Sequence, residues 1–194
     1  VFIAAFAIAI DPVDPLKVYA ATAANVVRST DGGANFSSVS TGLPLGQKRA
    51  IAIDRTTPST LYVAVPNAGV FKSTNSGTNW SQSNVGLANL AVFALAVDLN
   101  NPAIVYAGTV IGGDAFAVRL DPSGSALEYV LTFGGNELDE ARGVALGSDG
   151  TPYIVGSTSS QSFKAKIPRV ILERVVFKVH RNLIILLGNI ENNL

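Results

Sequence analysis

The sequence predicts an all-β domain of the β-propeller class, built of four-stranded antiparallel blades, with about four blade equivalents in 194 residues. Two observations carry this prediction. The segments 7–11, 50–54 and 94–98 repeat one alternation of small and apolar residues ending in Asp, at spacings of 43 and 44 residues. No helical apolar periodicity runs through these repeats, and a period near 44 is typical of one blade. The sequence leaves open whether the blades close as a small ring or form part of a larger one.

Composition narrows the class of protein. With 48% hydrophobic residues, 14% charged residues and a formal net charge of zero, the chain is globular rather than disordered. It has no cysteine, which excludes disulfides and thiolate metal sites. No apolar run approaches the roughly 18 residues that a membrane-spanning helix needs, so we expect no membrane span.

The first ten residues are apolar, but they lack a basic leader and run into the first repeat. We therefore expect a strand there rather than a signal peptide. Because the chain begins with Val1 and contains no Met, we expect a processed, excised or incomplete chain.

Each repeat begins with the strand that should lie innermost in its blade. The small Ala residues of segments such as 50–53 permit close packing near the axis, and we expect both faces of this strand to be buried between neighbouring blades. An aspartate follows each of these strands, at Asp11, Asp54 and Asp98. Recurrence in every repeat favours a turn-capping role over catalysis. A second strand is expected at 18–20, 61–63 and 105–107.

Two further segments, 25–36 and 69–80, each predict a strand, a tight polar turn and a second strand that begins with an aromatic residue. We expect Asp31 and Asn75 to accept hydrogen bonds from backbone N–H groups two residues on. Gly33 and Gly77 should supply the positive φ angle that such a turn needs. The aromatic residues that end the segments, Phe36 and Trp80, should fold back over the turn and bury a large apolar area.

These turns resemble the Asp box, Ser-x-Asp-x-Gly-x-x-Trp, of sialidase-type (BNR) repeats, sortilin-like propellers and some xyloglucan-cleaving glycosidases. The matching residues are Ser29, Asp31, Gly33 and Phe36 in the first copy and Ser73, Asn75, Gly77 and Trp80 in the second. The first copy departs from the motif at Phe36, and the second departs at Asn75. The resemblance implies structural turns at the blade periphery, away from a substrate face. The alternative is a metal or ligand site around Asp31 or Asn75.

Residues 114–163 resemble a second repeat type, the bacterial SBBP β-propeller repeat. The resemblance rests on Asp-Ala-Phe at 114–116, Leu-Asp-Pro-Ser-Gly at 120–124 and Gly-Ser-Thr at 156–158. It implies no known chemistry. We expect segment 127–133 to return antiparallel to the strand that begins at Asp114, and segments 140–146 and 152–159 to form another hairpin. The propeller repeats thus cover 1–163, with the Asp-box type at 1–113 and the SBBP-like type at 114–163.

Residues 164–194 differ from both repeat types. They hold six Lys or Arg residues against two Glu, a net charge of +4. Their β-branched content predicts a basic hairpin that supplies the missing outer strands of the fourth blade. A frame error or a fused foreign segment is the alternative. Alternation of apolar residues in this tail favours a buried sheet over a nucleic-acid surface, and no nucleic-acid partner is expected.

A sialidase-like activity would need an arginine cluster, a Tyr–Glu nucleophile pair and an acidic Asp. Arginines and glutamates are present without a recognisable motif, at Arg28, Arg49, Arg119, Arg142, Glu128, Glu137 and Glu140. The acidic segment 136–140 can be read as a Ca²⁺ site or as a solvated loop, and the loop is favoured. With His180 as the only histidine, multi-histidine metal sites are excluded.

We therefore assign no catalytic, cofactor or metal residues. The sequence favours a non-enzymatic structural or recognition module of a secreted or surface bacterial protein that binds a glycan or protein partner. The extracellular location is implied by the family resemblance. The alternative is a fragment of a carbohydrate-active enzyme, either a sialidase-like or a xyloglucanase-like glycoside hydrolase.

Overall fold

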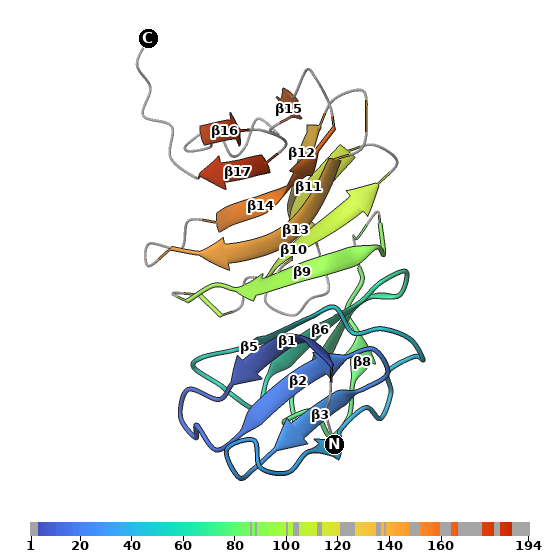
Figure 1. Cartoon of the computed structure of the whole chain (residues 1–194), viewed down its shortest axis with the longest axis vertical. Coiled ribbons are helices and arrows are strands. Elements are labelled where there is room, and N and C mark those ends of the chain that lie inside the picture. Colours follow the sequence, from blue (N-terminus) through green and yellow to red (C-terminus); the bar gives the residue numbers. More distant parts are fainter. Residues whose placement is uncertain are drawn as a thin grey trace.

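The structure is a computed structural model that describes residues 4–85, 87, 89–99, 101–102, 105–111, 114–120, 127–134, 137, 139–147, 152–159, 164–166, 176–180 and 183–187. At 110–134, at Pro152 and from Lys164 onward, only the backbone is described within those ranges. Every regular element in the described part is a β-strand, and the strands form antiparallel sheets (Figure 1). No helix among the described residues is long and apolar enough to cross a membrane.

The first two sheets are four-stranded meanders in which neighbours in sequence pair. The first holds β1 (Ala5–Ile10), β2 (Val18–Thr22), β3 (Val26–Ser29) and β4 (Ser37–Ser38). The second holds β5 (Ala50–Ile53), β6 (Leu61–Val65), β7 (Gly69–Ser73) and β8 (Ser81–Gln82). The 43-residue repeat therefore corresponds to one complete sheet.

The third sheet contains β9 (Val92–Val97), β10 (Val105–Ile111), β11 (Asp114–Leu120) and β12 (Leu127–Gly134), with β15 (Lys164–Lys166) added beside β12. Strand β12 returns antiparallel to β11, as expected. Strands β10 and β11 pair from Val105 with Leu120 to Ile111 with Asp114. The boundary drawn at residue 113 thus falls between two paired strands of one sheet. The division of the chain by repeat type remains a prediction.

The fourth sheet has the order β13 (Asp139–Leu146), β14 (Pro152–Thr158), β17 (Leu183–Leu187) and β16 (Val176–His180). The β13–β14 hairpin matches the one expected from the sequence. Within residues 164–194, β17 pairs with β14 and β16 pairs with β17, whereas β15 lies in the third sheet. The backbone after β14 therefore contributes strands to two sheets.

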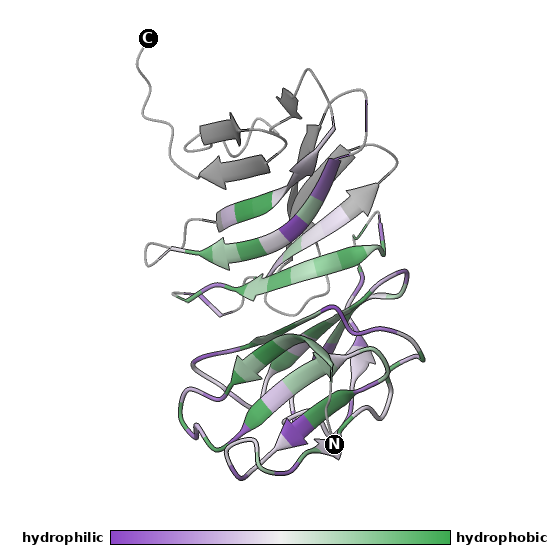
Figure 2. Cartoon of the chain, in the orientation of Figure 1, coloured by the Kyte–Doolittle hydropathy of each residue, from purple (hydrophilic) through white to green (hydrophobic). Residues whose placement is uncertain are grey.

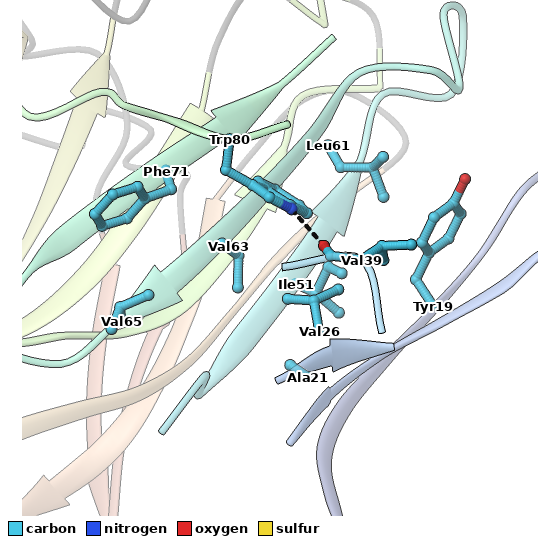
Figure 3. Packing of buried hydrophobic residues seen from close by; sticks show 10 residues of the cluster. All are labelled: Tyr19, Ala21, Val26, Val39, Ile51, Leu61, Val63, Val65, Phe71 and Trp80. Carbon is cyan, nitrogen blue, oxygen red and sulfur yellow. Dashed lines mark hydrogen bonds between the residues drawn. The ribbon is translucent and has the colours of Figure 1, made fainter. Parts of the chain in front are cut away.

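The innermost strand of each sheet contacts its counterpart in the next sheet: β1 with β5, β5 with β9, and β9 with β13. Hydrophobic residues concentrate in the strands, while the start of β13 is hydrophilic (Figure 2). One apolar cluster joins the first and second sheets, and it includes Tyr19, Val39, Ile51 and Trp80 (Figure 3). A second cluster joins the second and third sheets around Tyr62 and Val105.

The expectation that both faces of every innermost strand are buried is wrong for β1. Ile51 and Leu95, in the middle of β5 and β9, are 7% and 8% exposed, whereas Ile8 at the same repeat position in β1 is 63% exposed. The reason is the position of β1 at one end of the series of sheets: it packs against β2 and β5.

The aspartates that follow the innermost strands cap turns, as predicted. Asp11 Oδ1 accepts hydrogen bonds from the backbone N–H groups of Val13 and Asp14, at 2.9 and 3.1 Å. Asp54 Oδ1 accepts bonds from the N–H groups of Thr56 and Thr57, and Asp98 Oδ1 accepts one from Asn101. All three aspartates are buried. Each carboxylate therefore stabilises the turn that leads to the second strand of its repeat.

Hydrogen bonds from Lys48 stabilise the connection between the first two sheets. Its side chain is buried, and its ammonium donates hydrogen bonds of 2.7–2.8 Å to the carbonyl oxygens of Ala24, Pro44 and Gly46. Three backbone acceptors offset the cost of burying this charge. Arg49 follows Lys48 and directly precedes β5.

Candidate functional site

The two turns that resemble Asp boxes, 29–36 and 73–80, have the same hydrogen-bond pattern. The hydroxyl of Ser29 donates to Asp31 Oδ1 at 2.6 Å and accepts a bond from Gly33 N at 2.9 Å. Ser73 makes the same two bonds with Asn75 and Gly77, at 3.0 and 2.9 Å. The positive φ angles predicted at both glycines are confirmed, at 97° and 82°.

The expectation that Asp31 and Asn75 accept bonds from the backbone N–H groups two residues on is wrong in both turns, since Gly77 N likewise donates to Ser73 Oγ and Asn75 Oδ1 accepts from Asn79 N. Gly33 N, two residues after Asp31, donates to Ser29 Oγ, and Asp31 Oδ1 accepts instead from Asn35 N at 2.9 Å. The reason is that Gly32 and Gly33 both have positive φ, which curls the chain back over the serine hydroxyl. Hydrogen bonds from Ser29 and from the backbone and side chain of Asn35 lower the pKa of Asp31 to about 2. All partners of this carboxylate are therefore local.

The aromatic residues that end the two turns have different environments. Trp80 is buried, and its Nε1–H donates a 2.7 Å hydrogen bond to the carbonyl of Val39, the residue that follows β4 (Figure 3). Its backbone N–H also donates to Thr41 O at 2.9 Å. Phe36 remains 37% exposed. These turns connect the outer strands of their sheets, β3 to β4 and β7 to β8.

A cleft of about 440 Å³ lies where the innermost strands of all four sheets meet. Its lining residues come from β1, from the position directly before β5, from β9 and from β13: Phe6, Arg49, Phe93, Glu140, Ala141 and Arg142. We call it the inner-strand cleft. It has the size of a small-ligand site.

The lining follows from the repeat. Phe6, Arg49, Phe93 and Arg142 each stand one residue before the small–apolar–Ala–apolar segment of an innermost strand. Equivalent positions of packed repeats point to the same place, so the repeat brings two phenylalanines and two arginines together. The sequence thus contained a signal for this cleft in the residue that precedes each repeated segment.

Arg49 is held between the two aromatic side chains. Its guanidinium carbon lies 4.4 Å from the ring centre of Phe6 and 5.9 Å from that of Phe93, within the range of cation–π attraction. Its Nε is buried and has no hydrogen-bond partner in the described part of the chain. A guanidinium that lines a cleft beside apolar side chains is suited to binding an anionic or strongly polar acceptor.

The remaining charged residues of the cleft, Arg142 and Glu140, form an ion pair with each other. Arg142 contacts Glu140 Oε2 through its Nη2 at 2.6 Å and its Nε at 2.8 Å. Ser157 Oγ lies 3.5 Å from the same oxygen. Glu140 is the one carboxylate among the six lining residues, so these six residues do not provide the pair of carboxyl groups that glycoside hydrolysis requires.

The arginines and glutamates named from the sequence are thus separated. Arg49, Arg142 and Glu140 meet in the inner-strand cleft, whereas Arg28 donates to Ser76 O between the first two sheets. Glu137 is exposed, and the side chains of Arg119, Glu128 and His180 lie outside the described residues. Sequence reasoning did not include Phe6, Phe93 or Ala141 in a site. Among the described residues, no group of three His, Cys, Asp or Glu side chains could hold a metal ion.

No protein-family model and no curated protein sequence matches the chain. Solved structures do match. A GH74 enzyme from Niastella koreensis matches with a TM-score of 0.62 and 20% sequence identity, over 79% of this chain and 26% of that one. The extracellular domain of a putative one component system, BT4673 from Bacteroides thetaiotaomicron, matches at 0.60 and 14%, over 84% and 21%.

An auxiliary nutrient binding protein from Bacteroides thetaiotaomicron matches with a TM-score of 0.58 and 15% identity, over 80% of this chain and 36% of that one. These neighbours are β-propeller proteins, so the chain has a propeller-type fold and its sheets are blades. The chain spans about a quarter of the length of the GH74 enzyme.

Proposed function

We propose that this chain is a recognition module of a secreted or surface bacterial protein and binds a glycan or protein partner at the inner-strand cleft. One observation carries the proposal: the innermost strands of all four blades contribute to one cleft around Arg49. A site built from several blades is held by the packing between blades, so its side chains are pre-positioned. We also propose that the turns at 29–36 and 73–80 are Asp boxes with a structural role.

The charge of the cleft favours a ligand with an acidic group. Two arginines and one glutamate line it, which leaves one positive charge after Glu140 pairs with Arg142. The phenylalanines on either side of Arg49 reduce its contact with water, and a charge-assisted hydrogen bond is stronger in such surroundings. A carboxylate of an acidic sugar or of a peptide is the group that we expect at Arg49.

Isothermal titration calorimetry tests this proposal with three probes: an acidic oligosaccharide, a neutral xyloglucan oligosaccharide and an acidic peptide. Arg49→Gln removes the charge, and we expect affinity for an acidic probe to fall by about 10- to 100-fold, because a hydrogen bond to a charged group contributes about 1.5–3 kcal/mol. Arg55→Gln is the matched control, since Arg55 is exposed and lies outside the cleft. Equal loss in both variants, or binding that is insensitive to Arg49, contradicts the proposal.

A second candidate function is part of a carbohydrate-active enzyme. The fold similarity to GH74 enzymes, together with Glu140 in the cleft, favours testing it. Release of reducing ends from xyloglucan or a sialylated glycan, abolished by Glu140→Gln, would support an enzyme. Binding without turnover would support the recognition module.

A further inference from the structure

The first blade presents a hydrophobic face that the other blades bury. Ile8 is 63% exposed, Ile10 is 55% exposed and Phe36 is 37% exposed. At the same repeat positions of the second blade, Ile51 is 7% exposed in place of Ile8, and Trp80 is 5% exposed in place of Phe36. We call Ile8, Ile10 and Phe36 the apolar end face.

The concentration of exposed apolar residues in this blade is pronounced. Six of the eleven exposed large hydrophobic residues among the described side chains lie between positions 6 and 36. Exposed apolar patches of this kind mark interaction surfaces in soluble proteins. The first blade therefore carries a surface suited to burial.

The contact between the first and second blades shows what such a face packs against. There, Ile51 and Trp80 pack in one cluster with four residues of the first blade: Tyr19, Ala21, Val26 and Val39. The Trp80 indole also donates to the Val39 carbonyl. Gly42 allows this approach, because its φ is +92° and a Cβ there would collide with the Trp80 carbonyl oxygen.

We infer that the apolar end face is an interface for a further four-stranded propeller blade of the same repeat type. The partner is defined by its chemistry: an apolar surface like that formed by Tyr19, Ala21, Val26 and Val39, which would cover Ile8 and the ring of Phe36. The argument rests on continuity with an interface already present in the chain. It does not depend on the function proposed for the inner-strand cleft.

The first blade of this chain can serve as the added blade in the test. A tandem protein carries a copy of residues 1–48 joined directly to Phe6, so that the copied Lys48 precedes Phe6 as it precedes Arg49 in the native chain. The original Phe36 is changed to Trp as a reporter, which matches the residue at position 80. The emission spectrum of this reporter is obtained by subtracting the spectrum of the same protein without the substitution. The reporter spectrum is then compared between the tandem and the single chain.

Docking should shift the reporter emission to shorter wavelength and protect it from acrylamide in the tandem, but not in the single chain. Val39→Asp in the copy alone should abolish both effects, because Val39 is where the aromatic residue of the next blade packs. The midpoint of thermal unfolding should also rise in the tandem, and Ile8→Glu should abolish that rise while changing the midpoint of the single chain only slightly.

Two results would overturn the inference. One is a tandem in which the reporter stays as exposed as in the single chain. This result counts against the inference even if the added residues do not fold, because docking should order those residues. The other is a concentration-dependent blue shift of the Phe36→Trp single chain with dimer formation in analytical ultracentrifugation. That outcome would assign the face to a second copy of this chain instead of a further blade.

Discussion

The pair Ile51 and Ile8 offers a direct test of how the blades are arranged. Both residues occupy the second position of the repeated Ala–apolar–Ala–apolar segment, in β5 and β1. Ile51 is 7% exposed and Ile8 is 63% exposed. Replacing each by Ala changes the same atoms and the same intrinsic strand preference. The difference between the two variants therefore isolates burial between blades.

The expected magnitudes follow from exposure. Ile51→Ala removes three carbons from the cluster that joins the first two blades, and truncations of this kind cost about 2–5 kcal/mol in folded cores. For a chain of this size, a loss of about 3 kcal/mol lowers the melting temperature by about 6–12 °C. Ile8→Ala removes atoms that already contact water, so we expect a loss of about 1 kcal/mol or less.

Urea unfolding followed by fluorescence measures both variants, because Trp80 is the only tryptophan and lies in the same cluster as Ile51. Circular dichroism supplies an independent reading of the same transition. Equal losses of stability in the two variants would refute the reasoning, since they would mean that β1 is as well covered as β5. A larger loss for Ile8→Ala would refute it more strongly.

Three further predictions concern turns and connections. Asp31→Asn should remove an acid-sensitive contribution to the free energy of unfolding. The pKa of Asp31 is about 2 in the folded chain and 3.8 without its partners, so this stabilisation is present above about pH 4 and is lost as the pH falls towards 2. Urea unfolding at pH 6, 4 and 2.5 would detect the loss. Lys48→Met should lower the free energy of unfolding by about 3 kcal/mol or more, because three carbonyls lose a charged donor; an unchanged urea midpoint would contradict this. Gly42→Ala should destabilise the chain more than Gly46→Ala, since both glycines have positive φ but only at Gly42 would a Cβ meet Trp80; equal midpoints would contradict it.

The fold class was predictable because several independent sequence features recur with the same period. Alternating small and apolar residues, the aspartate after each innermost strand and the polar turns recur together near a 44-residue period. Each of these local choices favours the same four-stranded unit, so they reinforce one another. The aspartate caps were predicted for the same reason, since they need only local backbone donors.

The site was only partly predictable. Arg49, Arg142 and Glu140 were noted from the sequence, but Arg49 directly precedes β5 whereas Glu140 and Arg142 lie in β13, and no local rule brings these two segments together. The phenylalanines on either side of Arg49 were missed because a single aromatic residue before a strand has an ordinary structural interpretation. Aligning the residue before each repeated segment would have grouped Phe6, Arg49, Phe93 and Arg142.

By itself, the sequence determined the strand pattern, the blade-like unit and the chemistry of its turns, because these depend on residues close together in the chain. Tertiary structure decided which equivalent residues are buried. Ile51 and Ile8 share a repeat position and differ almost completely in exposure, since one faces the first blade and the other lies at the end of the series. It also decided that the buried Nε of Arg49 has no hydrogen-bond partner among the described residues. Burial depends on neighbours supplied by other blades, and a repeat does not encode its own position in the series.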